Sequence, residues 1–277
     1  MKRIPFLLFC LLLTLAGHTQ SPPLKDSIEK KYLTNGAWRH HYFSKEWQLY
    51  LDSALAVLPD DAKFWQLKAM PYFKQRKYEA GMVYLDKAVQ LNPAAYLDYR
   101  AFIKCIFQKS YHAAIADFEA AKRLNAHQGV MDHSYNFYIG LSYLQLNQYD
   151  SARYYLQQCM AERQQQNKEA PMHFLYDFYM GIADYETGQY DSAIAHFNTA
   201  LSHYPDFSDA GYYKALCLIK LNRKEEAKLA MAKSIHDYKE GYTINEDNAV
   251  YEPYPYQVRA WLFSYYKNLL GLQEPLK

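Results

Sequence analysis

Two short blocks of sequence occur twice in this chain at one interval. The pentapeptide Gln-Tyr-Asp-Ser-Ala occupies residues 148–152 and returns unchanged at residues 189–193. Upstream of each copy, Phe-Tyr-Ile-Gly at residues 137–140 is matched by Phe-Tyr-Met-Gly at residues 178–181, in the same register. Two matched blocks at one spacing indicate a chain built from a repeated unit. A repeat of this size favours a stacked solenoid over a globular enzyme.

The repeated unit is expected to be a pair of helices. In the second copy we expect a helix over residues 174–187, a turn at residues 188–190 and a second helix over residues 191–203, ended by Pro205. Asp191 or Ser192 is expected to cap the second helix, since their side-chain oxygens accept free amide protons. From Ala62 onward, apolar residues recur three, four and seven positions apart, which is helical spacing. The expected fold is therefore all-α, a solenoid of antiparallel helix pairs.

Small residues recur at fixed places in the unit, and we expect them where the two helices of a pair cross closely. They are Ala69, Gly140, Gly181 and Ala215 on the first helices, and Ala152 and Ala193 on the second helices. Larger residues such as Leu156 and Phe197 are expected to fill the gap between neighbouring pairs.

The order aromatic, Gly or Ala, aromatic, then Tyr, Ala, Leu or aromatic, Ala and Pro resembles the tetratricopeptide repeat, whose unit is 34 residues. Tyr190 and Lys224, at equivalent turns, are 34 residues apart. Longer spacings place insertions at residues 125–132 and 161–172, both at unit boundaries, and we expect the second to extend a helix. The resemblance covers residues 62–241, about five units, and implies a right-handed superhelical solenoid.

The two ends of the chain depart from this pattern. Residues 21–61 are expected to form a degenerate N-terminal helical repeat, because residues 45–58 carry apolar helical spacing closed by Pro59. Residues 242–277 are expected to begin with a Tyr/Pro-rich segment that is extended at residues 251–256, since a residue before proline is pushed out of the helical region. A final helix over residues 258–270 would then cap the solenoid.

The first twenty residues have the layout of a secretory signal peptide: a basic start at Lys2 and Arg3, a short apolar run and a small-residue exit. We therefore expect residues 1–20 to direct export to the periplasm or cell envelope. Without Lys2 and Arg3 the chain carries equal numbers of basic and acidic residues. No basic stripe points to nucleic acid as a partner, and no later segment approaches transmembrane length.

The sequence offers no motif for catalysis, for a cofactor or for a metal ion. It lacks a glycine-rich phosphate loop, Gly-x-Ser-x-Gly and His-Glu-x-x-His, and no cysteine pair has metal-ligand spacing. His40 and His41 are adjacent and are interpreted as surface residues. Cys105, Cys159 and Cys217 lie on apolar faces of expected helices and are predicted to be buried free thiols. A non-enzymatic protein is expected.

The resemblance implies that the first helices of successive units line a concave groove that binds a peptide. The candidate groove residues are Phe73, Lys74, Tyr99, Ile103, Phe137, Leu141, Phe178, Ile182 and Tyr212. Because most are apolar or aromatic, the carboxylate clamp of basic and asparagine residues found in some family members is not carried over. The implied partner is an apolar or aromatic segment of another protein. Alternatively, packing between units and the chain's own C-terminal helix cover these side chains.

Two further functions stay open at this stage. A glycan-binding envelope protein is one of them, since exposed tyrosine and tryptophan rings can stack on sugars. A permanent structural subunit of an envelope assembly or secretion complex fits the repeats equally well. The sequence does not define an oligomeric state.

Overall fold

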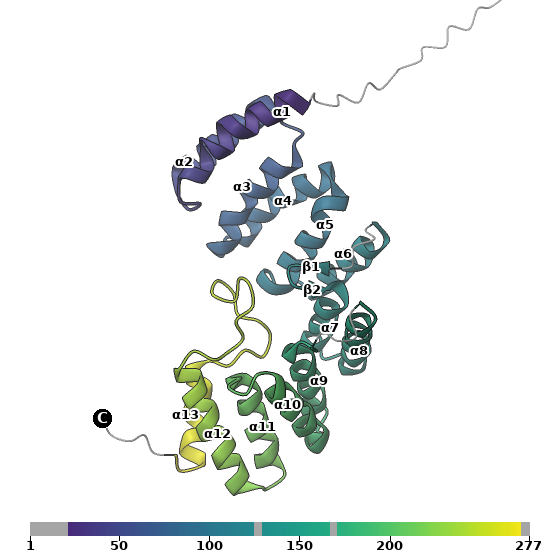
Figure 1. Cartoon of the computed structure of the whole chain (residues 1–277), viewed down its shortest axis with the longest axis vertical. Helices are drawn as coiled ribbons and strands as arrows, with labels where there is room; N and C mark the ends of the chain where they lie inside the picture. The colour runs from purple at the N-terminus through teal and green to yellow at the C-terminus, as the bar shows by residue number, and fades with distance from the viewer. Residues whose placement is uncertain (1–21, 125–128, 167–170, 273–277) are drawn as a thin grey trace, which may run out of the picture. The chain divides into compact units, whose positions relative to one another are not determined.

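The structure, a computed structural model, describes residues 22–124, 129–166 and 171–272 (Figure 1). The chain divides into two compact units, with the boundary in the sequence between Pro59 and Asp60. The predicted signal peptide, residues 1–20, lies outside the described residues. Within the described ranges, no helix combines the length and apolar character that crossing a bilayer requires.

The N-terminal unit consists of short helical pieces. They are α1 (Pro22–Glu29), η1 (Lys30–Thr34), η2 (Ala37–Arg39) and α2 (Lys45–Val57). Ser44 caps α2, because its Oγ accepts a hydrogen bond from the backbone N–H of Trp47 at 3.2 Å. Leu33 and Leu51 are fully buried and give this unit a small core of its own.

The second unit contains five helical hairpins, each packed on the next. They are α3 (Ala62–Lys74) with α4 (Tyr78–Leu91), α5 (Pro93–Phe102) and η3 (Ile103–Phe107) with α6 (Tyr111–Leu124), α7 (Tyr135–Gln145) with α8 (Tyr149–Gln166), α9 (Phe174–Glu186) with α10 (Tyr190–His203), and α11 (Ser208–Lys220) with α12 (Lys224–Lys239). A final helix, α13 (Ala260–Leu269), contacts α12. The prediction of an all-α solenoid is confirmed.

The two insertions lie where the sequence placed them, between hairpins. Before α7, β1 (Gly129–Val130) pairs antiparallel with β2 (His133–Ser134), and this is the one piece of sheet in the described ranges. At the second insertion α8 extends to Gln166, as expected, and residues 167–170 lie outside the described residues.

The predicted small residues are all buried, and the two glycines lie at close helix crossings. A Cβ atom on Gly181 would lie 2.6 Å from Cε1 of Phe197, and one on Gly140 would lie 3.0 Å from Cγ of Leu156. Phe197 and Leu156 thus fill crossings inside their own hairpins. Phe197 also stacks on Tyr213 of α11 in the next hairpin, at a ring-centroid distance of 6.3 Å, so for this residue the expected packing between neighbouring hairpins is found as well.

Every hairpin turn has one residue in the left-handed region of the backbone. These residues are Arg76, Lys109, Asn147, Gly188 and Asn222. In the fourth hairpin the N–H of Gln189 then donates to the carbonyl of Asp184 at 2.8 Å, the long bond of a Schellman motif. Because this turn is so tight, α10 starts at Tyr190 and Gln189 takes the N-cap position without a side-chain hydrogen bond. The predicted caps Asp191 and Ser192 were therefore wrong; Ser192 Oγ donates instead to Asp184 Oδ2 at 2.5 Å.

The three cysteines of the described residues are buried and free, as predicted. Burial raises the pKa of the Cys105 thiol to about 11, so this residue stays protonated and unreactive at neutral pH.

Candidate binding groove

After α12 the chain does not simply end in a capping helix. Residues 242–259, named here the return loop, run back from α12 toward the earlier hairpins before α13 begins (Figure 1). The expectation of an extended stretch over residues 251–256 holds only in part. Pro253 and Tyr254 lie outside any turn, but Tyr256 adopts a left-handed φ of 60° within a turn. Proline excludes the helix at its neighbours, yet it is compatible with turns.

One buried carboxylate holds both ends of the return loop. Asp209, in the first turn of α11, accepts a hydrogen bond on Oδ1 from the N–H of Val258 at 2.7 Å. Its Oδ2 accepts from the N–H of Ile244 at 3.2 Å and from Oγ1 of Thr243 at 2.8 Å. Burial raises the pKa of Asp209 to about 6, against the opposing effect of these hydrogen bonds.

Three side chains of the hairpins bind main-chain carbonyls of the return loop. Arg76 Nη2 donates to the carbonyl of Tyr251 at 3.1 Å, and Lys109 Nζ donates to that of Pro253 at 2.9 Å. The hydroxyl of Tyr179 donates to the carbonyl of Pro255 at 3.0 Å. The contacted carbonyls are those of every second residue, and their donors come from the first, second and fourth hairpins.

Polar side-chain contacts add to this backbone recognition at the first hairpin. The hydroxyl of Tyr78 donates to Glu252 Oε2 at 2.9 Å, and Arg76 Nε lies 3.3 Å from the same oxygen. Burial, together with this carboxylate, raises the pKa of Tyr78 to about 12. The ammonium of Lys74 lies 4.7 Å from the ring centroid of Tyr251, within range of a cation–π contact.

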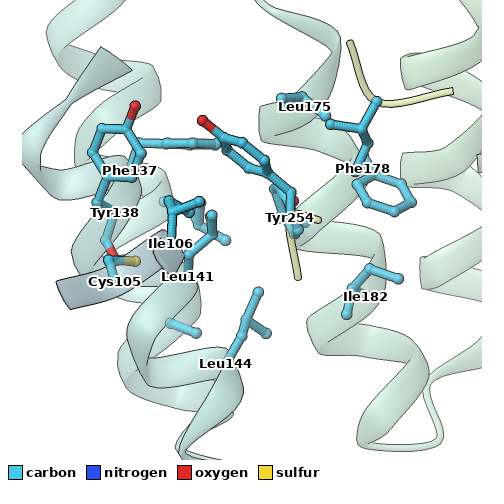
Figure 2. Close-up of a cluster of buried hydrophobic side chains, with 14 of the residues drawn as sticks. Cys105, Ile106, Phe137, Tyr138, Leu141, Leu144, Leu175, Phe178, Ile182 and Tyr254 are labelled. Carbon is cyan, nitrogen blue, oxygen red and sulfur yellow. The ribbon is translucent and has the colours of Figure 1, made fainter. Parts of the chain in front are cut away.

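Tyr254 is the aromatic anchor of the return loop. Figure 2 shows its side chain between α7 and α9, with its hydroxyl pointing toward α7. The labelled cluster around it comprises Cys105, Ile106, Phe137, Tyr138, Leu141, Leu144, Leu175, Phe178 and Ile182. Tyr254 is 3% exposed, and two residues further on Tyr256 meets the ring of Tyr213 edge-on at 5.8 Å.

The predicted groove residues are mostly inaccessible in this structure. Phe73, Ile103, Phe137, Leu141, Phe178, Ile182 and Tyr212 are buried, and Lys74 and Tyr99 are partly buried. The ring of Phe263 on α13 covers Tyr212, at a centroid distance of 5.3 Å. The alternative of self-coverage therefore describes this structure. The expected cover was packing between units together with the C-terminal helix; the return loop, which was not expected there, covers the face between α7 and α9 (Figure 2).

A second polar cluster joins the return loop to the middle of the solenoid. His133 Nε2 lies 2.8 Å from Glu246 Oε2, and His173 Nε2 lies 3.7 Å from Glu246 Oε1. Burial and the neighbouring His133 lower the pKa of His173 to about 4. Burial is the largest single effect on Glu246 and opposes its ionisation, but the hydrogen bond from His133 and the electrostatic effects of His133 and His173 together lower its pKa. His133 Nδ1 is buried without a hydrogen-bond partner among the described residues.

Sequence reasoning missed most of the residues that hold the return loop. In the sequence, Asp209 is indistinguishable from the acidic residues that commonly stabilise the start of a helix. Arg76 and Lys109 are likewise indistinguishable from ordinary charged residues in turns. His133, His173 and Glu246 are far apart in the sequence and show no spacing motif. Tyr179 alone carried a signal, because it lies inside a repeated block whose tyrosine is retained in both copies.

Comparison with known proteins settles the family of this fold. Family models described as tetratricopeptide repeat match residues 62–94, 135–164 and 184–240. The chain is a tetratricopeptide-repeat protein. The fold of this repeat binds other proteins or peptides and is generally non-enzymatic, so a protein-interaction role follows for the chain.

Solved structures show the same fold at low sequence identity. The tetratricopeptide-repeat protein is similar to PilW, a type IV pilus biogenesis factor, at 14% identity and a TM-score of 0.63, over 79% of this chain and 96% of that one. It is also similar to a tetratricopeptide repeat protein from Parabacteroides merdae, at 14% identity and a TM-score of 0.59, over 82% and 95% of the two chains. Aspartyl phosphate phosphatase F from Bacillus subtilis matches at 16% identity and a TM-score of 0.61, over 92% and 70%. Comparison with the curated proteins gives no match.

Proposed function

We propose that this tetratricopeptide-repeat protein is a non-enzymatic scaffold of the bacterial cell envelope. Its concave face binds an extended, aromatic segment of a partner protein in the place that the return loop occupies. One observation carries this proposal: Arg76, Lys109 and Tyr179 donate hydrogen bonds to carbonyls of alternate residues along the loop. Main-chain carbonyls are the same in every peptide, so these donors suit a partner's backbone as well as the chain's own.

The side-chain contacts indicate which partner segment fits. The cluster between α7 and α9 accepts an aromatic ring, as it accepts Tyr254 (Figure 2). Two residues before that ring, Tyr78 and Arg76 bind a carboxylate, as they bind Glu252. An extended segment with an acidic residue two positions before an aromatic one therefore matches the groove. Envelope location is supported by the signal-peptide layout of residues 1–20, and N-terminal sequencing of the protein from a cell fraction tests it.

A labelled peptide tests the binding site directly. Tyr254→Ala removes the anchor of the return loop and leaves the donors Arg76, Lys109 and Tyr179 in place. A peptide with the sequence of residues 250–259 is expected to bind this variant one to one, measured by fluorescence anisotropy. Wild-type protein is expected to bind it at least tenfold more weakly, because the attached loop competes at high effective concentration. The matched protein control is Tyr265→Ala, which removes a tyrosine that is 68% exposed on α13.

The same peptide with alanine in place of its central tyrosine is the ligand control, and it is expected to lose binding. The proposal is wrong if Tyr254→Ala retains its helical circular dichroism, its loop amides exchange freely with solvent and the peptide still does not bind. The apolar side chains of the first helices would then belong to a closed hydrophobic core that the return loop completes.

A further inference from the structure

His133, His173 and Glu246 come together from three parts of the second unit. His133 lies on β2 directly before α7, His173 is the N-cap residue of α9, and Glu246 belongs to the return loop. One potential ligand atom from each residue lies within 4.8 Å of the other two. The rings of the two histidines are almost perpendicular, at 89°, with centroids 4.9 Å apart.

We propose that these three side chains form a binding site for a divalent transition metal ion, with Zn²⁺ as the fitting ion. Two imidazoles and one carboxylate are a ligand set that zinc takes in proteins, with a fourth position left for water. The His133 and Glu246 side chains are 1% and 9% exposed, whereas His173 is 36% exposed. The site is thus buried on two sides and open on the third, which gives the ion a path of entry and room for the water.

Binding requires a small rearrangement that is itself measurable. Ligand atoms around a tetrahedral zinc ion lie about 3.4 Å apart, given zinc–ligand distances near 2.1 Å. The 2.8 Å contact between His133 Nε2 and Glu246 Oε2 must therefore open by about 0.6 Å to admit the ion. With the metal on Nε2 of His173, the ring proton occupies Nδ1. The long 3.4 Å hydrogen bond from the N–H of Leu175 to Nδ1 is then lost.

The bound ion would fasten the return loop to the third and fourth hairpins, because Glu246 belongs to the loop and the histidines belong to the solenoid. The inference does not rest on peptide binding by the groove, since the metal alone is the probe and a failure of either leaves the other untouched.

Zinc titration of the purified, untagged full chain, stripped with a chelator, tests the site by competition calorimetry. One ion per chain is expected. His173→Ala and Glu246→Gln are each expected to weaken binding at least tenfold, since each removes one of only three protein ligands. His112→Ala, which removes an exposed histidine of α6, is the matched control and is expected to bind like wild type.

Amide hydrogen exchange gives a readout that does not depend on affinity. Zinc is expected to slow exchange of the return loop in wild type and not in His173→Ala, and to shift the amide resonance of Leu175. Absence of saturable binding by wild type would overturn the proposal and leave a hydrogen-bonded His–Glu cluster. Equal affinity of wild type and both ligand variants would overturn it as well, since the ion would then bind elsewhere.

Discussion

The third and fourth hairpins carry the same repeated blocks, yet their equivalent residues do different work. Tyr179 of α9 donates its hydroxyl proton to the carbonyl of Pro255. The hydroxyl of Tyr138, at the same place in α7, is buried without a hydrogen-bond partner among the described residues. Directly after the shared pentapeptide, Arg153 of α8 lies 2.9 Å from Asp184 of α9, whereas the equivalent residue Ile194 of α10 is a buried apolar side chain.

The difference shows which part of the chain gives a repeated residue its role. The repeat determines the hairpin, and it places a tyrosine on the inner face of each copy. The return loop is not repeated. It presents the carbonyl of Pro255 to Tyr179 in the fourth hairpin, whereas the side chain of Tyr254 points toward α7 in the third hairpin (Figure 2). Identical residues in a solenoid are therefore equivalent in packing and inequivalent in binding.

Of the substitutions that test this difference between the two hairpins, Tyr254→Ala is expected to have the largest effect. The ring of Tyr254 lies between α7 of the third hairpin and α9 of the fourth (Figure 2). Removal of a buried aromatic side chain costs about 3–5 kcal/mol of stability, here drawn from docking of the loop. Hydrogen exchange is expected to accelerate in residues 243–258 while α8 and α10 stay protected. Equal acceleration in both hairpins would mean that the loop is an integral part of the core.

Asp209 makes docking of the loop depend on pH. Its pKa of about 6 in the folded chain lies above the ordinary aspartate value of 3.8, so the folded state binds the proton more tightly. The stability that Asp209 contributes therefore rises as pH falls from about 6 to about 4. The difference in unfolding free energy between wild type and Asp209→Asn is expected to grow in favour of wild type, by up to about 3 kcal/mol from pH 7 to pH 4.

Urea denaturation of both proteins at several pH values measures this difference, and all other titrating groups are common to the pair. A difference that is constant from pH 7 to pH 4 would show that the hydrogen bonds from Val258, Ile244 and Thr243 fully offset the effect of burial on the pKa of the carboxyl group.

Gly181→Leu tests the close crossing of the fourth hairpin, and Gly140→Leu tests that of the third. A new Cβ would lie 2.6 Å from Phe197 in the first case and 3.0 Å from Leu156 in the second. Overpacking is expected to cost about 1–3 kcal/mol, with the larger loss at Gly181 because the rigid ring of Phe197 has less freedom to move than leucine. Thermal unfolding measures both, and the reverse order would show that the aromatic ring yields more readily than Leu156.

Tyr179→Phe and Tyr138→Phe remove one hydroxyl from each copy. Loss of the hydrogen bond to Pro255 is expected to cost about 0.5–1.5 kcal/mol. Loss of the Tyr138 hydroxyl is expected to be neutral or slightly stabilising, because a buried polar group without a hydrogen bond is itself unfavourable. Urea denaturation of the two variants separates these outcomes, and equal losses would mean that the two hydroxyls are equivalent after all.

The hairpins were predictable from sequence because local physics determines them. Apolar spacing, small residues at crossings and proline after the second helix act within about 34 residues, so the repeat shows them several times over. The start of α10 was misplaced by one residue because the cap depends on the left-handed turn at Gly188, which places Gln189 and not Asp191 at the helix start.

The return loop was only half predictable, since its contacts join residues far apart in the chain. Proline and tyrosine at residues 251–256 predicted a non-helical segment, and the apolar first helices predicted an inner face that needs a cover. Nothing local linked Asp209 to Val258 or Lys109 to Pro253, because each pair is formed by tertiary packing alone.

The turn residues of the first two hairpins have a consequence for engineering. Asn147, Gly188 and Asn222 are residue types that accept the left-handed backbone, whereas Arg76 and Lys109 adopt it at φ near 60° despite their long side chains. A thermostabilisation programme would therefore choose Arg76→Gly and Lys109→Gly first, to relax the two turns. The same substitutions delete the donors to Tyr251 and Pro253. A scaffold stabilised in this way would hold its return loop with fewer hydrogen bonds. The apolar side chains of the first helices, which the loop covers, would then be more accessible.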